Sequence, residues 1–143
     1  LSLLERMARE AAIVKGGASG VLSLQISLEP KEEGHEGGKP ALSWNQALHD
    51  IALEHSINMA DGKVPFGHAG FNNRAKKVPF YYRSFSENVA YNYGCADPVE
   101  VAVRGWINSP GHRKNMLAVN NCCAIAVYQK YGKYWFTQLF ALT

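Results

Sequence analysis

The sequence lacks an apolar run approaching the ~20 residues that a membrane-spanning helix requires. It also lacks a strong charge imbalance, because 15 basic and 12 acidic residues give a net charge of only +3. The basic residues are scattered rather than gathered in a stripe, which argues against a nucleic-acid partner. We therefore expect no transmembrane segment and no nucleic-acid binding.

Cysteine is scarce, with only Cys95, Cys122 and Cys123 in the chain. This number is too small for a disulfide-dense scaffold, and it is odd, so at least one thiol is free or pairs between chains. Adjacent residues on a strand face opposite sides, so only one of Cys122 and Cys123 can easily meet Cys95. Two alternatives remain open: one disulfide in an oxidising compartment, or three reduced thiols.

The chain begins at Leu1 rather than at a methionine, so we expect a processed product or a trimmed chain. The lack of a visible signal peptide therefore says nothing about the compartment. A chain of 143 residues, 47% hydrophobic and 19% charged, fits one globular domain. We expect a single domain over residues 1–143, without internal repeats.

Helical spacing of Leu3, Leu4, Met7, Ala11 and Ile13 predicts a helix over residues 1–15, ended by two glycines. Strict alternation over residues 22–28 predicts a half-buried strand. Residues 29–40 are almost devoid of apolar side chains and indicate a solvent loop that contains His35. Residues 1–40 are thus expected to form a helix and strand-like extension.

Ser43 and Gln46 form a capping-box pattern, which predicts that a helix starts here and continues to Asp61-Gly62. Its inward stripe is expected to be Leu48, Ile51, Ala52, His55, Met59 and Trp44. Residues 62–86 are expected to be mostly irregular. Asp97-Pro98 predicts the start of another helix, which the Pro110-Gly111 pair breaks before a short helix over 113–117.

The C-terminal third predicts two strands, one alternating over residues 123–128 and one over 134–142, joined by a turn at 130–133. The second strand has few polar residues on either face, so we expect it to be central and covered on both sides. Helices followed by an antiparallel hairpin predict helical layers packed against a sheet.

Few residues in the sequence are candidates for catalysis or metal binding. The sequence contains no GxSxG elbow, CxxC pair, HExxH pair or phosphate-binding loop. Glu87 lies in the apolar stretch ENVAYN, where a carboxylate is costly to bury unless it is paired. His68 and His112 lie in the segments GHAGFNNR and SPGHRKNML. These three residues alone are a weak indication of a site.

Five motifs occur in one order over residues 41–141: LSWNQALHDIALEHSINMA, GHAGF…R, SENVAYN, GWINSPGHRKNML and CCAIAVY…YWFTQLFA. Together they resemble the CAP superfamily of cysteine-rich secretory, antigen 5 and pathogenesis-related proteins, whose domain is also called SCP. The SPGHR form is similar to the bacterial-type branch. The resemblance implies an α/β (α+β) fold, a three-layer α-β-α sandwich with a central antiparallel sheet.

The resemblance also implies a cleft in which His68, Glu87 and His112 converge and can bind zinc or magnesium. Many secretory members carry a further glutamate three residues after the tryptophan matched by Trp106. This chain has Ser109 there, so its acidic set is one residue short.

Three functions follow from these residues and the resemblance. The first is a secreted or surface-associated binding module, with a divalent metal in the cleft and a sterol, another lipid, a small ligand or a protein as partner. The second is a metal-dependent hydrolase or protease, in which Glu87 accepts a proton from metal-bound water. The third is a scaffold in which His68, Glu87 and His112 form a buried brace.

Overall fold

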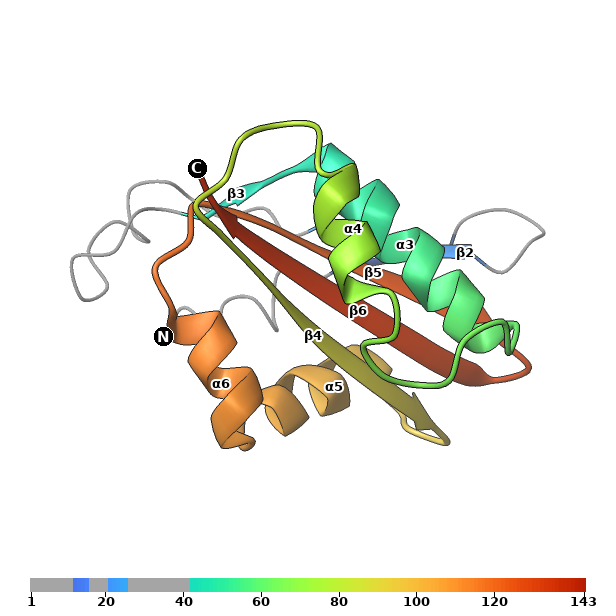
Figure 1. The fold of residues 1–143 in the computed structure, drawn as a ribbon. Coiled ribbons are helices and arrows are strands. Elements are labelled where there is room, and N and C mark those ends of the chain that lie inside the picture. Colours follow the sequence, from blue (N-terminus) through green and yellow to red (C-terminus); the bar gives the residue numbers. More distant parts are fainter. Residues whose placement is uncertain (1–11, 16–20, 26–41) are drawn as a thin grey trace.

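The computed structural model describes residues 12–15, 21–25 and 42–143, and Figure 1 shows their arrangement. The strands are β1 (Ala12–Lys15), β2 (Val21–Gln25), β3 (Ser43–Trp44), β4 (Ser84–Tyr93), β5 (Cys122–Lys130) and β6 (Lys133–Leu142). The helices are α3 (Gln46–Ala60), α4 (Phe71–Lys77), α5 (Pro98–Ile107) and α6 (Pro110–Leu117). None of the helices in these ranges combines the length and hydropathy needed to cross a membrane.

The strands form one sheet in the order β1-β2-β5-β6-β4, in which all neighbours are antiparallel. The two-residue β3 adds a parallel pairing to β5. The predicted C-terminal hairpin is confirmed, and β6 lies between β5 and β4 as expected for a central strand. Strand β4 forms the edge of the sheet along which the candidate site is built.

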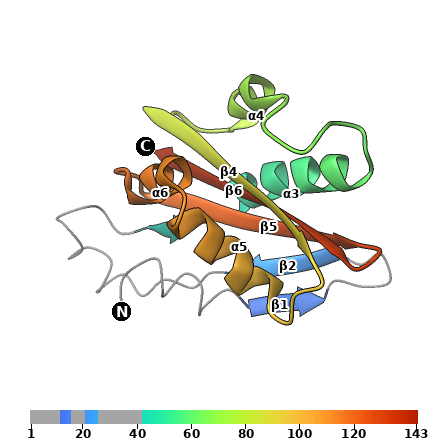
Figure 2. The same ribbon diagram turned by 90° about the horizontal axis from the view of Figure 1, so that it is seen from below.

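Helices cover both faces of the sheet, with α3 and α4 on one side and α5 and α6 on the other (Figure 2). Alternate residues of β5 enter separate cores: Cys123 and Ile125 pack with Trp106 of α5. Ala124 and Ala126 pack with Leu48 of α3 on the opposite face. The expected three-layer α-β-α sandwich is therefore confirmed, since each face of the sheet buries its own apolar cluster.

The local sequence predicts the N-cap residue of α5 correctly and that of α3 wrongly. Asp97 caps α5, its side chain accepting from the Glu100 N–H at 3.1 Å. The expected Ser43–Gln46 capping box is wrong, because Ser43 belongs to β3 and Asn45 caps α3 by accepting from the Leu48 N–H. Ser43 pairs with Cys122 of β5 as part of β3, so it does not serve as the N-cap of α3.

One further expectation needs correction. Ala12–Lys15 were expected to end a helix but form β1, whose Ile13 and Val14 lie opposite Leu24 and Ser23 of β2. Both residues are β-branched, and strand pairing outweighs the helical spacing around them. The remainder of the expected helix and the solvent loop with His35 lie outside the described residues. Residues 62–86 are mostly irregular, as expected, and the regular elements among them are α4 and the start of β4.

None of the three cysteines, which all lie in the described part of the chain, forms a disulfide. Cys123 is buried in the core beside α5, whereas Cys122 packs on the α3 side. The two neighbouring thiols thus face opposite sides of β5, as the alternation of a strand requires.

Candidate functional site

Glu87 is the central acid of the site, and β4 holds it inside the molecule with a side chain only 1% exposed. Its register partner on β6 is Leu139, so the carboxylate lies on the face of the sheet covered by α3 and α4. His68 from the loop before α4 binds it, with 2.8 Å between Nδ1 and Oε1. Because a carboxylate only accepts, the His68 Nδ1 donates the proton in this bond.

Arg74 of α4 neutralises the Glu87 carboxylate through two bonds, Nε to Oε2 at 2.6 Å and Nη2 to Oε1 at 2.7 Å. Its remaining N–H groups reach the backbone oxygens of His68 and Ala69 and the ring of His55. All five guanidinium donors therefore have partners within the protein. This saturation makes Arg74 a brace rather than a ligand-binding group.

His55 on α3 completes the brace. Its Nε2 lies 2.7 Å from the Gly67 carbonyl oxygen and therefore carries the proton, while Nδ1 accepts from Arg74 Nη1 at 3.0 Å. Burial lowers the pKa of His55, and the adjacent Arg74 charge acts in the same direction. The neutral ring ties the loop that carries His68 to α3.

Gly70 allows the approach of Arg74 to this loop. It caps α4 at φ 82°, a left-handed conformation that favours glycine. A Cβ atom at this position would lie 3.2 Å from Arg74 Nη1. The small residue Gly70 thus allows the Arg74 guanidinium to approach the loop that carries His68, in addition to leaving space around the imidazole.

Asn88, the neighbour of Glu87 on β4, points to the other face of the sheet and holds α6 there. Its Nδ2 donates to the His112 backbone oxygen at 3.2 Å and to Gln138 Oε1 at 3.0 Å. Asn115 of α6 donates to the Glu87 backbone oxygen, which lies on the outer edge of β4. Two successive strand residues thus fix two segments, one from each helical layer.

His112 lies inside α6 rather than before it, and its Nδ1 is 2.8 Å from the Ser109 hydroxyl oxygen. Ser109 is the N-cap residue of α6, but its side chain makes no capping bond and binds this ring instead. Burial lowers the pKa of His112, and the nearby His68 lowers it further. Positive charge on His68 thus disfavours a second positive charge on His112.

The comparisons with known proteins agree with this geometry. The family model described as "Cysteine-rich secretory protein family" (CAP) matches residues 35–140. The chain belongs to the CAP family.

Two solved structures resemble this chain in fold. An extracellular protein containing an SCP domain from Bacillus anthracis has a TM-score of 0.61 and 30% identity, over 75% of this chain and 35% of that one. An outer surface protein from Borrelia burgdorferi has a TM-score of 0.60 and 19% identity, over 73% of this chain and 79% of that one. The low identity of the second shows the fold alone.

A curated relative from Bacillus subtilis is described as "Uncharacterized membrane protein YlbC". It is 33% identical over 85 residues, which make up 56% of this chain and 23% of the relative. The chain thus spans about a quarter of that protein and about a third of the Bacillus anthracis protein.

Few side-chain atoms of this CAP domain are arranged as metal ligands usually are. Within residues 42–143 and the described strands before them, no group of three or more His, Cys, Asp or Glu side chains could hold a metal ion. Both Glu87 oxygens are occupied by Arg74 and His68. Among the described residues, the Nε2 atoms of His68 and His112 have no hydrogen-bond partner in the site.

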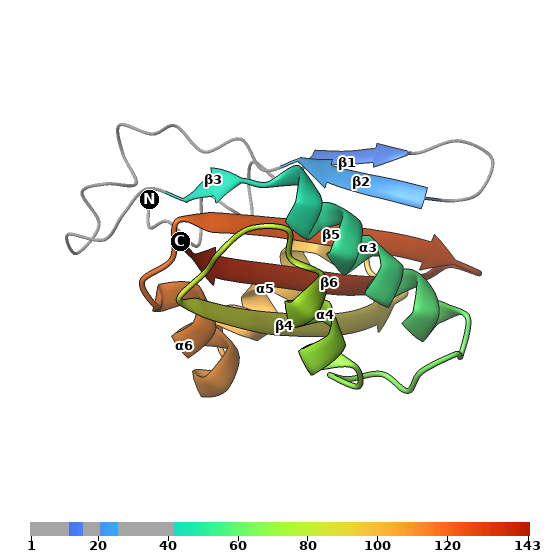
Figure 3. The ribbon, with the colours of Figure 1, turned by 45° about the horizontal axis from the view of Figure 1, so that its top comes forward.

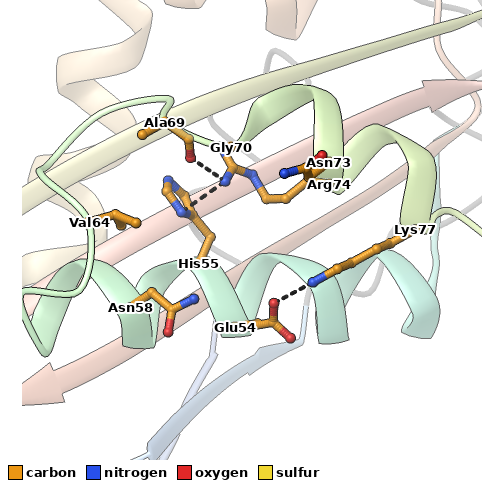
Figure 4. A pocket seen from close by; sticks show the side chains of 9 residues that line it. All are labelled: Glu54, His55, Asn58, Val64, Ala69, Gly70, Asn73, Arg74 and Lys77. Atoms are coloured by element: carbon orange, nitrogen blue, oxygen red, sulfur yellow. Dashed lines mark hydrogen bonds and ion pairs between the residues drawn. The ribbon is translucent and has the colours of Figure 1, made fainter.

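A pocket of about 170 Å³ opens between α3 and α4, with His55 and Arg74 in its lining (Figure 4). Polar and charged side chains dominate its lining, including Glu54, Asn58, Asn73 and Lys77. Glu54 and Lys77 form an ion pair of 2.6 Å across its rim. This lining suits a small polar molecule better than an apolar chain.

The structure brings His68 and Glu87 into direct contact and places His112 on α6, in the helical layer on the other face of the sheet. Sequence reasoning missed Arg74 and His55 as members of the site. Arg74 was present in the GHAGF…R motif, and His55 was expected on the buried stripe of α3. These two features were the signals available in the sequence. Neither of them indicates that Arg74 would contact Glu87 and His55.

Proposed function

We propose that this CAP domain is an extracellular binding module in which His68 and His112 bind a divalent metal, with zinc preferred over magnesium. Glu87 acts indirectly by orienting His68. The observation that carries the proposal is the His68–Glu87 bond, because it fixes which nitrogen of His68 can bind a metal.

With Nδ1 donating to Glu87, a neutral His68 has its lone pair on Nε2. A carboxylate behind a metal-bound imidazole is the common arrangement in zinc sites, where it orients the ring and raises its basicity. The His68 side chain is 53% exposed, so this nitrogen can be reached from solvent while Glu87 stays buried.

His112 supports the proposal through its protonation state and its hydrogen bond. Burial and His68 lower its pKa, which favours the neutral form that a metal requires. When Nδ1 donates to the Ser109 hydroxyl, Nε2 carries the free lone pair. Ser109 thus orients the His112 ring through Nδ1, as Glu87 orients the His68 ring.

Two imidazole nitrogens without a bound carboxylate favour zinc, because imidazole suits zinc whereas magnesium prefers oxygen ligands. Two protein ligands leave the remaining coordination positions to water or to a bound molecule. We therefore propose weak, exchangeable binding in which the metal serves as a point of attachment for a ligand with an oxygen or nitrogen donor.

The hydrolase alternative is less well supported. A general base must accept a proton from the reacting water, but both Glu87 oxygens already accept hydrogen bonds and the side chain is buried. The polar pocket between α3 and α4 likewise lends no support to a sterol as its occupant. The brace is compatible with the binding module, because Arg74 and Glu87 hold the ligand histidine in place.

Placement outside the cell is supported by the Bacillus anthracis relative, which is an extracellular protein. Three free cysteines are compatible with this placement but do not favour it.

Isothermal titration with zinc tests the metal proposal. We expect one weak site in the wild type, loss of that site in both His68→Ala and His112→Ala, and no comparable heat with magnesium. Residues 32–36 read EEGHE and could bind zinc by themselves, so every protein should carry His35→Ala. Zinc binding that survives both substitutions in this background would contradict the proposal.

A further inference from the structure

One end of the sheet extends beyond the helix that covers it. Helix α3 ends at Ala60, and its C-cap residue Asp61 bonds to Lys130 at the end of β5. Beyond this point the loop after α3, the end of β4 and the β5–β6 turn gather at the same end of the molecule (Figures 1 and 3). This region, residues 63–66, 91–93 and 130–135, is called the sheet end below.

Aromatic rings form a continuous surface on the sheet end. Tyr91 stacks on Trp135 with 5.1 Å between ring centroids, in the register given by the β4–β6 pairing. Tyr93 and Phe66 lie 6.0 and 6.2 Å from the same Tyr91 ring. Phe66, Tyr91 and Tyr93 are all exposed, with Tyr93 at 65%. Contiguous exposed apolar surface of this kind commonly marks an interaction site.

Tyr131 adds an independent observation. It is 89% exposed at the tip of the β5–β6 hairpin and has φ 55°, as the only non-glycine residue with positive φ in the described chain. A two-residue hairpin turn with positive φ at both positions normally has Asn, Asp or Gly first. A bulky aromatic residue that is strained yet almost wholly in solvent contributes little to folding, which points to a contact outside the molecule.

Positive charge accompanies these rings. Lys133 lies opposite Tyr93 and opposite Lys130 in the last strand pairs of the sheet. Lys130 is paired with Asp61, whereas Lys133 and Lys63 form no ion pair with a described residue. The two free lysines flank the aromatic surface and give it complementarity to an anionic partner.

We propose that the sheet end docks on the surface of a lipid bilayer that contains anionic lipids. Tyrosine and tryptophan rings suit the headgroup region, where an apolar body and a polar tip are both accommodated. Lysines beside them add attraction to anionic headgroups. The rings project from three separate tips at one end of the molecule, which suits a broad deformable surface. The contact is peripheral and places the loop with His68, two residues after Phe66, beside the membrane.

Co-sedimentation with vesicles tests the docking. We expect the protein to bind vesicles of phosphatidylcholine and phosphatidylglycerol, and to bind much less to phosphatidylcholine alone. Lys133→Ala should lower the partition coefficient about fivefold, because a lysine near an anionic surface is worth ~1 kcal/mol. The double variant Tyr93→Ser/Tyr131→Ser should lower it at least tenfold. EDTA should have no effect, so this result is separate from the zinc proposal.

Matched controls come from elsewhere in the molecule. Tyr81 is 81% exposed and precedes the start of β4, so it lies near the opposite end of that strand from Tyr93. Tyr81→Ser and Lys76→Ala, an exposed lysine on α4, should therefore bind as the wild type does. If the control variants lost as much vesicle binding as the sheet-end variants, binding would be non-specific electrostatic or hydrophobic adsorption, and the proposal would be overturned.

Tryptophan quenching locates the contact. Lipids brominated near the headgroup should quench Trp135 fluorescence, and Trp135→Phe should remove most of that quenching. The other two tryptophans should contribute little, because Trp106 is buried and the half-buried Trp44 precedes the start of α3, whereas the sheet end adjoins the end of that helix. Absence of binding to anionic vesicles would overturn the proposal, as would binding without quenching. Retention on cell-wall polysaccharide in place of vesicles would show that the rings stack on sugars instead.

Discussion

Arg74 binds both carboxylate oxygens of Glu87, with Nε 2.6 Å from Oε2 and Nη2 2.7 Å from Oε1. Both side chains are nearly excluded from solvent. The pair joins α4 to β4, and through His55 and His68 it fixes the loop between α3 and α4. The position of a candidate metal ligand thus depends on a buried ion pair that contacts no ligand itself.

Arg74→Ala should lower the free energy of unfolding by about 3–5 kcal/mol, because it leaves the buried Glu87 carboxylate without its counter-charge. Arg74→Lys should recover only part of this loss, since an ammonium group cannot replace five donors in a planar fork. Urea unfolding measures both, with the exposed Arg83→Ala as the control. An Arg74→Ala protein as stable as the Arg83→Ala protein would show that the pair is not a brace.

Ser109 should affect zinc affinity without affecting stability. Ser109→Ala removes the hydroxyl that orients the His112 ring, and we expect about tenfold weaker zinc binding, as for outer partners of metal ligands elsewhere. Ser109→Glu places a carboxylate where many secretory CAP proteins carry one and should strengthen binding. Titration calorimetry measures the affinities, and unfolding midpoints check the fold. Unchanged affinity in both variants would rule out this role for Ser109.

Local patterns predicted the parts of the fold that local chemistry determines. The Asp97-Pro98 signal located α5, and the alternation over 123–128 with the β-favouring residues over 134–142 located the hairpin. The expected helix over residues 1–15 failed at Ile13 and Val14, because their strand state depends on pairing with a separate segment, β2, which the spacing within residues 1–15 does not reveal.

The candidate site shows the same division. The family motifs pointed to His68, Glu87 and His112, and the first two are in contact. They did not reveal that Arg74 saturates the carboxylate, because this depends on a contact across 13 residues between α4 and β4. They also gave no reason to connect Ser109 with His112 beyond spacing, whereas the structure joins them directly.

His49 should make the fold sensitive to acid. It is buried beside Trp44, with 5.0 Å between ring centroids, and neither ring nitrogen has a hydrogen-bond partner among the described residues. Burial lowers its pKa below 6.5, only partly offset by Asp50. The unfolded chain therefore takes up this proton at higher pH than the folded one. The stability contribution is present above pH 6.5 and is lost as the pH falls through the folded pKa.

His49→Phe keeps a ring beside Trp44 but removes the titrating group. We expect a shallower fall in stability between neutral pH and about pH 5 than in the wild type. The remaining slope should arise from His55 and His112, whose pKa values are also lowered by burial. Urea midpoints across this pH range give both curves. Parallel curves would mean that His49 finds a partner or solvent in solution.

The thiols should differ sharply in reactivity. Burial raises the pKa of Cys123 to about 12, so its reactive thiolate is scarce at neutral pH and the sulfur is out of reach. Iodoacetamide should modify the partly exposed Cys95 and Cys122 in the native protein and all three thiols after denaturation without reductant. Intact-mass measurement counts the labels. A single label after denaturation would reveal a disulfide in the isolated protein.

Tyr131 should trade stability against membrane docking. Its φ of 55° costs an L-residue about 1–2 kcal/mol, which glycine does not incur. Tyr131→Gly adds some backbone entropy to the unfolded chain, so we expect a net stabilisation of about 0.5–1 kcal/mol together with weaker vesicle binding. Thermal unfolding and co-sedimentation of the same sample measure the two effects. Because a damaged fold would lose stability and docking together, a rise in one with a fall in the other assigns the exposed ring to the lipid surface. Stabilisation with unchanged vesicle binding would show that the Tyr131 ring does not contact the lipid bilayer.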